Sequence, residues 1–389
     1  MQGNSYSYES LSAVRPSVID IDLDAVVNNF LLIKEKVGKS AVMPILKANA
    51  YGHGLLQVAQ VLEEAGAERY CLAYLEEAVA LRRAGIDIPL LVLGPAAKEQ
   101  IPDFIKYDIE LTIPSIYKLH EVEEVAKAVG KKAKLHLKID TGMERIGTHY
   151  YSANTFLEET IKCPNCDIVG IFSHFATDEE EDLSFAHLQL ERFLEIASFF
   201  EKHSLPTPLR HIANSAAICR MPESYLDGVR PGLTLYGIQI APHIKILEGT
   251  KRTFKLSSKV SYFKVVKPNV GIGYDLTYTT QNQTRVVTIP IGYGDGFPRR
   301  LSNKGSVIIR GHKYPIVGKV CMDQLMVDVG PEGEAYNGDE VILIGEQGNE
   351  IITVEEIADM VGTDVRDVLC STNLRIPRRY HYKNKTFVD

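Results

Sequence analysis

From Ala41 onward, short β-rich apolar runs alternate with segments of helical hydrophobic spacing, and this alternation constrains the fold more than any other feature. Because each run is apolar on both faces, the pattern predicts parallel strands that are buried on both sides. Eight strand–helix units predict a TIM-like (β/α)8 barrel, with an open doubly wound sheet as the alternative on pattern alone. The eight runs are AVMPILK, RYCLAYL, PLLVLG, IELTI, AKLHLKID, DIVGIFSHF, LRHIANS and DGVRPGL.

The pattern of apolar and turn-forming residues changes after residue 245. Short β-like runs separated by Gly, Asn and Asp then predominate, with little helical pattern except TVEEIADMVG, so we expect a mostly β C-terminal domain. The predicted organisation is an N-terminal tail (1–16), a barrel domain (17–245) and the β-rich domain (246–389). The early segment SVIDIDL predicts an extra strand over 17–22, which we expect at the edge of the C-terminal sheet.

Composition narrows the class of protein. Lys and Arg total 43 against 50 Asp and Glu, a net charge of −7 without a long basic run, so no nucleic-acid partner is expected. No apolar stretch is long enough to span a membrane, and the first residues lack a secretory leader, so we expect a cytoplasmic protein. Only Cys163-Pro-Asn-Cys166 has the spacing of metal ligands, and no second pair accompanies it, which favours free thiols and no metal site.

Polar side chains occur where the predicted barrel strands end. In a parallel barrel these ends meet at one mouth, where catalytic groups collect. Lysine, histidine and arginine around one mouth indicate a site for an anionic ligand. The residues are Lys47, Lys138, Asp140, His174, Asn214, Ser215 and Arg230.

Lys47 ends the apolar run MPIL and precedes the loop ANAYGHG, an unusual place for a charge. It could hold a phosphate or carboxylate as a point charge, or form a Schiff base with a carbonyl group. The hydroxyls of Tyr51 and Ser215 and the backbone amides around Gly232 are donors of the kind that phosphates favour. A phosphate site opposite a strand-end lysine suggests pyridoxal 5′-phosphate as cofactor.

The motif MPILKANAYGHG resembles the cofactor-lysine signature of the alanine racemase family, which are fold type III pyridoxal-phosphate enzymes. The resemblance covers nearly the whole chain, in order and across both predicted domains. It continues through KIDTGMERIG, SHFATDEE, HIANSAA, VRPGLTLYG, GIGYDLTY, IPIGYGDGFPRR, VGKVCMDQLMVD and LRIPRR.

The resemblance implies a two-base racemisation of alanine that supplies D-alanine for peptidoglycan, in a homodimer with shared active sites. Lys47 would carry the cofactor and act as base on one face of the substrate, and Tyr274 of a second subunit would act on the other face. Arg230 would face the pyridine nitrogen, His174 would lie between Arg230 and Tyr274, and Arg145 would contact the phenolic oxygen and the substrate. Met322 and Asp323 would lie at the substrate carboxylate, and Tyr293 at the entrance. The residues implied around the cofactor and its phosphate are Tyr51, Asn214, Ser215, Gly232 and Leu233.

Arg230 is the most diagnostic of these residues, because a guanidinium cannot readily supply a proton to the pyridine nitrogen as a carboxylic acid would. In parts of the family the lysine equivalent to Lys138 is carbamylated and orients the arginine equivalent to Arg145. The chain departs from the family pattern at Leu374, where a tyrosine often touches the phosphate. Tyr51 and Ser215 would then carry more of the phosphate binding.

Three other classes of protein compete with this interpretation. A barrel-type decarboxylase shares the cofactor but typically places an acidic residue opposite the pyridine nitrogen, where this sequence has Arg230. A non-catalytic cofactor carrier of the single-barrel type would leave the residues beyond the barrel, with Tyr274, unexplained. A binding protein without cofactor would lack absorbance from a bound aldehyde. The pattern leaves open whether serine or other amino acids are also substrates.

Overall fold

The computed structural model describes residues 15–388, so most of the predicted tail lies outside the described residues. Contacts within the chain divide it into two compact units, each described here by itself. The barrel unit comprises residues 25–50 and 55–251, and the second unit comprises residues 15–24, 51–54 and 252–388. No helix within the described part of the chain is long and apolar enough to cross a membrane.

The barrel unit contains the eight predicted parallel strands. Their order is β2-β10-β9-β8-β6-β5-β4-β3, and a parallel bridge from Ile45 to Cys71 joins the two ends of this order. The alternative of an open sheet is therefore wrong. The strands are β2 (Ala41–Val42), β3 (Tyr70–Leu72), β4 (Leu90–Pro95), β5 (Glu110–Ile113), β6 (Ala133–Asp140), β8 (Cys166–Phe172), β9 (Leu209–His211) and β10 (Gly228–Val229).

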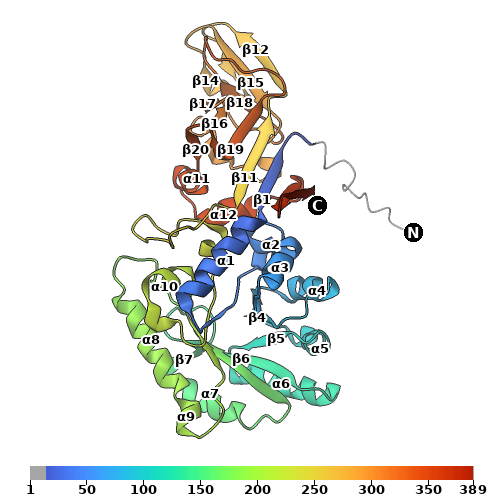
Figure 1. Ribbon diagram of the computed structural model, residues 1–389, viewed down its shortest axis with the longest axis vertical. Helices are drawn as coiled ribbons and strands as arrows, with labels where there is room; N and C mark the ends of the chain where they lie inside the picture. Colours follow the sequence, from blue (N-terminus) through green and yellow to red (C-terminus); the bar gives the residue numbers. More distant parts are fainter. Residues whose placement is uncertain (1–14, 389) are drawn as a thin grey trace, which may run out of the picture. The chain divides into compact units, whose positions relative to one another are not determined.

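Helices lie outside the barrel strands (Figure 1); α1 precedes the first of them, and the segment labelled α2 is a left-handed turn at the end of β2 rather than an outer helix. Strand β2 is short because Pro44, in the middle of the apolar run, has no amide proton to donate to a neighbouring strand. The short strand β7 (Thr148–His149), which pairs with β6, was not predicted. The helices are α1 (Leu23–Val37), α2 (Lys47–Tyr51), α3 (Leu55–Glu64), α4 (Leu75–Arg83), α5 (Ile101–Lys106), α6 (Ile116–Val129), α7 (Ala153–Thr160), α8 (Ser184–Ala197), α9 (Phe199–Lys202) and α10 (Ser215–Arg220).

The second unit is built on a sheet of 11 strands, with β13 (Gly271–Ile272) and β14 (Tyr278–Thr279) as a separate hairpin. The predicted fold class, a barrel followed by a mostly β region, is therefore confirmed. The sheet strands are β1 (Val18–Asp22), β11 (Phe254–Lys259), β12 (Tyr262–Val266), β15 (Thr284–Ile289), β16 (Ser306–Ile309), β17 (His312–Val317), β18 (Leu325–Asp328), β19 (Glu340–Gln347), β20 (Glu350–Ile352), β21 (Arg378–Tyr382) and β22 (Lys385–Val388).

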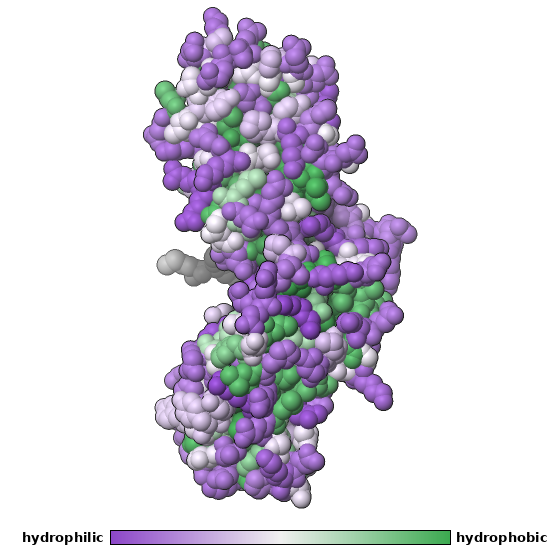
Figure 2. All heavy atoms as spheres, turned by 90° about the vertical axis from the view of Figure 1, so that its left-hand side faces the viewer, coloured by the Kyte–Doolittle hydropathy of each residue, from purple (hydrophilic) through white to green (hydrophobic). Residues whose placement is uncertain are grey.

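Two features of the second unit differ from expectation. Strand β1 pairs antiparallel with β11 and parallel with β21, so the expected edge position is wrong, because the strand has a neighbour on each side. Besides α11 (Val354–Val361), there is a second helix, α12 (Val365–Ser371), whose N-cap Asp364 accepts the Arg366 amide at 2.7 Å. On the face shown in Figure 2, exposed apolar residues are scattered among hydrophilic ones.

Candidate active site

Lys47 opens a left-handed turn at the mouth of the barrel unit. Ala48, Asn49 and Ala50 have φ/ψ near +55°/+50°, and Tyr51 continues the turn with φ 51°. For residues other than glycine this conformation costs about 1–2 kcal/mol each, and it seldom occurs in consecutive residues. The sequence KANAY therefore places strain directly beside the lysine, as is common where a functional group must be held in a fixed position.

Side-chain carboxylate and amide groups support this turn. The Ala48 amide donates to Oε1 of Glu77 at 2.7 Å, and Oε2 of the same carboxylate accepts the Ala73 amide at 2.9 Å. Oδ1 of Asn49 accepts the Leu55 amide at 2.8 Å, where α3 begins. Glu77 thus connects the loop after Lys47 with the loop before α4.

Arg230 lies in the interior of the barrel at the end of β10. Its Nη2 donates to the carbonyl oxygens of Ser173 at 2.7 Å and Ile212 at 3.0 Å, and lies 3.3 Å from Nδ1 of His174. Burial lowers the pKa of Arg230 to about 10, which still leaves the guanidinium charged at neutral pH. The predicted pairing of Arg230 with His174 is therefore present in the structure.

The pKa of His174 lies well below its ordinary value, so the imidazole is neutral. Burial is the largest cause, followed by the positive charges of Arg230, Arg145, Lys138 and Lys47, in that order. These cations come from three barrel strands or the loops that follow them: Arg230 follows β10, Lys47 follows β2, and both Lys138 and Arg145 belong to β6 and its loop. The positive charges around this neutral histidine are not balanced by its own charge, so an anionic ligand bound among them would be stabilised.

Lys138 is a buried lysine on β6. Its Nζ donates to the Ile139 carbonyl at 2.9 Å and lies 5.4 Å from the centre of the Phe172 ring. Burial is the main cause that lowers the pKa of Lys138 to about 7; Arg230 and Arg145 lower it further, while Asp140 opposes the shift. A substantial fraction of this amine is therefore neutral near pH 7.

Asp140 has a structural role at the end of β6. Its Oδ1 accepts the amides of Gly142, Met143 and Glu144 at 2.9, 3.0 and 3.2 Å. Burial raises the pKa of Asp140, but these amides outweigh it and lower the pKa below the ordinary value. The carboxylate thereby shapes the loop that carries Arg145, which is exposed at the mouth.

Four of the predicted phosphate-site residues, Asn214, Ser215, Gly232 and Leu233, lie close together after strands β9 and β10. Oγ of Ser215 accepts the amide of Gly232 at 2.8 Å and that of Thr234 at 3.3 Å. Asn214 is the N-cap of α10, and Leu233 begins the following 3-10 turn (Leu233–Tyr236). The sequence-predicted residues of this group are thus brought together in the structure.

Tyr51 and Leu374 belong to the second unit. Tyr51 is buried, and its carbonyl accepts Nδ1–H of His53 at 3.0 Å. Arg378 donates to the Gly52 carbonyl at 3.1 Å and to the backbone of the segment around Leu374. Leu374 itself is 82% exposed.

The other residues predicted in the second unit are exposed. Tyr274 is 68% exposed, Met322 is 52% exposed and Tyr293 is 42% exposed. The amide of Tyr293 donates to the Cys321 carbonyl at 3.0 Å, which places Tyr293 beside Met322 and Asp323. Asp323 accepts Nη2 of Arg375 at 2.6 Å, so its carboxylate already has a cationic partner.

The loop that carries Tyr274 is held by its neighbours. Asp275 forms an ion pair with Lys319, and a side chain at Gly318 would approach the Ile272 carbonyl to 2.7 Å. Gly318 has φ 72°, so glycine is needed there both for the backbone conformation and for the close approach. The structure therefore fixes the base of the loop while the phenol of Tyr274 stays exposed.

The sequence interpretation missed three buried residues inside the barrel, namely His136, His211 and Glu110. His136 lies two residues before Lys138 on β6, so it points to the same face of the strand. That alternation was the signal that could have revealed it. His211 Nδ1 lies 2.6 Å from Nη1 of Arg230, so these residues connect directly to the site.

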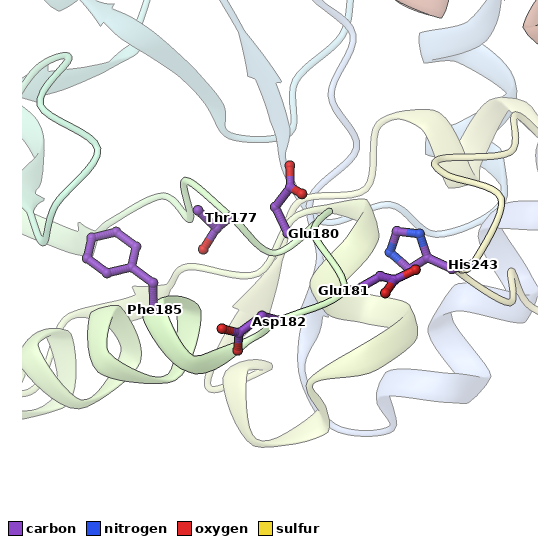
Figure 3. A pocket seen from close by; sticks show the side chains of 6 residues that line it. All are labelled: Thr177, Glu180, Glu181, Asp182, Phe185 and His243. Carbon is purple, nitrogen blue, oxygen red and sulfur yellow. The ribbon is translucent and has the colours of Figure 1, made fainter.

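A cavity of about 640 Å³ lies elsewhere on the barrel unit (Figure 3). Glu180, Glu181 and Asp182 of the loop before α8 line it, together with Thr177, Phe185 and His243. It contains none of the predicted site residues. Within residues 15–388, no cluster of His, Cys, Asp and Glu side chains is arranged to hold a metal ion.

Comparisons with known proteins cover both units. Residues 21–240 match the family model of the alanine racemase N-terminal domain, and residues 253–380 match that of the C-terminal domain. Alanine racemase 2 of Caldanaerobacter subterraneus subsp. tengcongensis is 41% identical over 376 residues, covering 96% of this chain and 97% of its own.

Solved structures are similar over the same extent. The alanine racemase of Clostridium difficile 630 has a TM-score of 0.90 at 36% identity, over 96% of this chain and 98% of its own. The alanine racemase of Bartonella henselae, solved with covalently bound pyridoxal phosphate, has a TM-score of 0.85 at 28% identity, over 94% of this chain and 99% of its own.

Proposed function

Because the chain belongs to the alanine racemase family, we propose that it interconverts L- and D-alanine with pyridoxal 5′-phosphate as cofactor. The observation that carries this proposal is the position of Lys47 at the barrel mouth, with Arg230 buried among the same strand ends. Supply of D-alanine for peptidoglycan and a cytoplasmic location follow from the same proposal.

The donor set of the barrel mouth fits the cofactor. Lys47 would bind its aldehyde carbon, the Ser215 hydroxyl and the amides at Gly232 and Leu233 would hold its phosphate, and Arg230 would face its ring nitrogen. When bound, pyridoxal phosphate withdraws electrons from an attached amino acid and so makes its Cα proton removable. Within residues 15–388, no carboxylate forms an ion pair with Arg230, which disfavours the decarboxylase alternative.

Two bases on opposite faces of the substrate would move the proton. Lys47 would remove or return the Cα proton on one face, and Tyr274 would do so on the other. Two groups are the economical solution, because inversion requires the proton to leave from one side and arrive on the other, and a single lysine that swings across the substrate plane would be slower. His174 would orient the phenol through its free ring nitrogen, while its Nδ1 faces Arg230.

The second subunit is part of the proposal. Tyr274, Tyr293 and Met322 are all substantially exposed although the family resemblance places them at the reaction centre. A homodimer in which each chain lends these residues to its partner's barrel accounts for both facts. Met322 and Asp323 would then lie at the carboxylate of the alanine bound to the partner, and Arg375 would limit the repulsion between Asp323 and that carboxylate.

Lys138 would support Arg145 in its carbamylated form. An amine with a pKa near 7 is partly neutral at physiological pH and can therefore react with carbon dioxide. The resulting negative group would attract Arg145, whereas the unmodified lysine repels it. Incubation with ¹³C-labelled bicarbonate should give a carbamate signal in the ¹³C NMR spectrum that Lys138→Met protein lacks; identical spectra would refute this assignment.

The function is tested with L-alanine, added cofactor and chiral chromatography of the products. Wild-type protein should produce D-alanine until both enantiomers are equal in amount, and Lys47→Ala should be inactive and lack the absorbance of bound cofactor. Lys98→Ala, which removes an exposed lysine on the barrel surface, is the matched control and should match the wild type. A wild-type protein that leaves L-alanine unchanged under these conditions would refute the proposed activity.

A further inference from the structure

A chain of hydrogen bonds connects Arg230 with a carboxylate deep in the barrel. Nη1 of Arg230 lies 2.6 Å from Nδ1 of His211, and Nε2 of His211 lies 2.9 Å from Nδ1 of His136. Nε2 of His136 then lies 3.0 Å from Oε2 of Glu110. All four side chains are at most 3% exposed, so no bulk water competes for these bonds.

The direction of these bonds is fixed at the Arg230 end. A guanidinium can only donate, so Nδ1 of His211 must accept and the proton of His211 must be on Nε2. His211 then donates to His136, which likewise carries its proton on Nε2 and donates to Glu110. Each group donates to the next one, and the series ends on a carboxylate that can only accept.

The charge states of the groups agree with this direction. Burial holds the pKa of His136 below its ordinary value and, with the charge of Arg230 as the second cause, holds that of His211 well below it. Burial raises the pKa of Glu110, but its bonds with His136 and Arg69 outweigh this and lower it. The series therefore consists of a cation, two neutral imidazoles and an anion.

The neighbouring strand is adapted to this arrangement. An ideal Cβ built on Gly170 of β8 would lie 2.1 Å from Nδ1 of His136, so only glycine leaves room for the ring. His211 stacks on Phe172 with ring centres 4.9 Å apart. Both histidine rings are thus held in place by packing as well as by hydrogen bonds.

The other charged groups near Arg230 do not take over the role of the Glu110 carboxylate at the end of the series. Asp178 and Arg145 act on Arg230 through their charges. The nearby Cys71 thiol carries no charge at neutral pH, because burial raises its pKa to about 12. Asp178 is the carboxyl among these groups; burial raises its pKa to about 6, so it is still mostly ionised at neutral pH, but its Oδ1 accepts from Asn214 at 3.2 Å and no hydrogen bond joins it to Arg230 among the described residues. Glu110 is therefore the ionised carboxylate to which Arg230 is joined by hydrogen bonds.

At the far end, Arg69 faces Glu110. Its Nη2 donates to Oε1 at 3.0 Å, and its Nε lies 3.0 Å from Oε2 without the alignment of a hydrogen bond. Glu110 is the first residue of β5, whereas Arg230 follows the last residue of β10. The series therefore runs from the amino ends of the parallel strands to the carboxyl ends, where the candidate active site lies.

We propose that Glu110 is a positioning residue that acts on Arg230 through the two buried histidines. It keeps the guanidinium oriented and balances its charge from a distance, so that no carboxylate needs to lie beside the cofactor's ring nitrogen. This inference rests on the proposed function, because it assigns Arg230 to that ring. Hydrogen bonds in series polarise one another, which is how a charge three bonds away can reach Arg230.

The first test is ¹⁵N NMR of histidine-labelled wild-type protein from about pH 6 to about pH 9. His136 and His211 should both be neutral, carry the proton on Nε2 and show no titration in this range. A proton on Nδ1 of His211, or titration of either ring, would overturn the proposal. These signals do not depend on turnover, so an inactive wild-type protein would refute the proposed function and leave the hydrogen-bond test intact.

The second test is Glu110→Gln, which keeps the shape of the side chain and removes its charge. The Nε2 proton signal of His136 should move upfield, and that of His211 should move in the same direction by a smaller amount. The kcat for alanine should fall by about 10-fold to 100-fold, as is typical for outer partners of functional groups, with KM little changed. An unmoved His211 signal or an unchanged kcat would overturn the proposal.

Two further variants separate this role from general stability of the barrel. Thr112→Val, on the same strand and equally buried, removes a hydroxyl that donates to the Val92 carbonyl at 2.7 Å, and should leave both histidine signals unmoved. Arg69→Gln frees the carboxylate from its outer cation, so both signals should move downfield. This second variant keeps the proposal testable if Glu110→Gln does not fold; an upfield or absent shift would refute it.

Discussion

At the scale of single residues, the barrel interior is unusual for the charge that it contains. Lys138 and Arg230 are each 3% exposed, and burial lowers the pKa of both. Burial of charge is costly unless other groups compensate it, so these residues reduce stability in return for a cationic site. This cost determines the direction in which the free energy of unfolding should change with pH.

Lys138 should make stability depend on pH. Its pKa is about 7 in the folded protein and about 10.4 in an unfolded chain, so between these values the unfolded state binds more protons. Stability therefore rises with pH in this window, by at most about 1.4 kcal/mol per pH unit, and the penalty is fully present below pH 7. The free energy of unfolding of wild-type minus Lys138→Met protein, measured in CO₂-free buffer, should increase from pH 7 to pH 9. Parallel pH profiles would contradict the assignment.

Gly170 should tolerate no side chain. Gly170→Ala would place a methyl group against the His136 ring, which its hydrogen bonds hold in place, and should lower the free energy of unfolding by at least about 1–3 kcal/mol. Gly228→Ala on β10 is the matched control, because the atom nearest to the added Cβ there is the flexible end of Met43, at 3.1 Å. Urea titrations that rank the two variants equally would contradict this account.

The sequence predicted the residues at the barrel mouth better than those inside it. Lys47, His174 and Arg230 stand out because a polar group follows an apolar run, and strand ends converge in any parallel barrel. His136 and Glu110 lie within apolar strands, where a single polar residue has no local signature of its partners. Their connection depends on which strands are neighbours across the barrel, which only the closed topology supplies.

At the scale of elements, the left-handed turn after Lys47 stands out because four consecutive non-glycine residues, 48–51, have positive φ. The sequence indicated a loop here, the segment ANAYGHG that follows the lysine. The structure instead shows an ordered turn supported by Glu77 and Asn49. Sequence patterns describe right-handed helices and strands, so they contain no signal for this conformation.

Ala48→Gly should stabilise the protein. Ala48 is exposed and has φ 53°, so glycine relieves strain without loss of packing, and the free energy of unfolding should rise by up to about 1 kcal/mol. Ala80→Gly, at an exposed position in the right-handed helix α4, should lower it by about 0.5–1 kcal/mol. Thermal or urea unfolding measures both values. Changes of the same sign would contradict the role of strain in the turn.

Short and nonlocal elements were the hardest to predict from sequence. Helix α12 has seven residues, too few for a clear helical period, although its Asp364 cap is a recognisable start. Strand β1 was expected at an edge because an isolated early strand gives no information about its neighbours. Its two partners, β11 and β21, lie near the beginning and near the end of residues 252–388.

At the scale of the whole molecule, the proposed active site needs two chains. The barrel unit carries Lys47 and the phosphate donors at Ser215, Gly232 and Leu233, while Tyr51 and Tyr274 belong to the second unit and Tyr274 is exposed. The predicted domain boundary near residue 245 stays a prediction, but the division of functional residues between the two units does not depend on its position.

Mixed dimers test the shared site. Lys47→Ala and Tyr274→Phe chains are each expected to be inactive, but a hybrid dimer would contain one site with both wild-type residues. Random exchange should make half of the dimers hybrid, each with one functional site of two, and so restore about a quarter of the wild-type activity per chain. Proven subunit exchange without recovery of activity would place both bases in one chain.

The central claim is that Lys47 and Tyr274 act on opposite faces of one substrate carbon. Its most direct test is Cα–H exchange by Tyr274→Phe protein in D₂O, followed by NMR separately for L- and D-alanine. The account predicts that one enantiomer still exchanges its Cα proton for deuterium through Lys47, while the other does not exchange and racemisation is lost. Full exchange of both enantiomers with racemisation at the wild-type rate would contradict it.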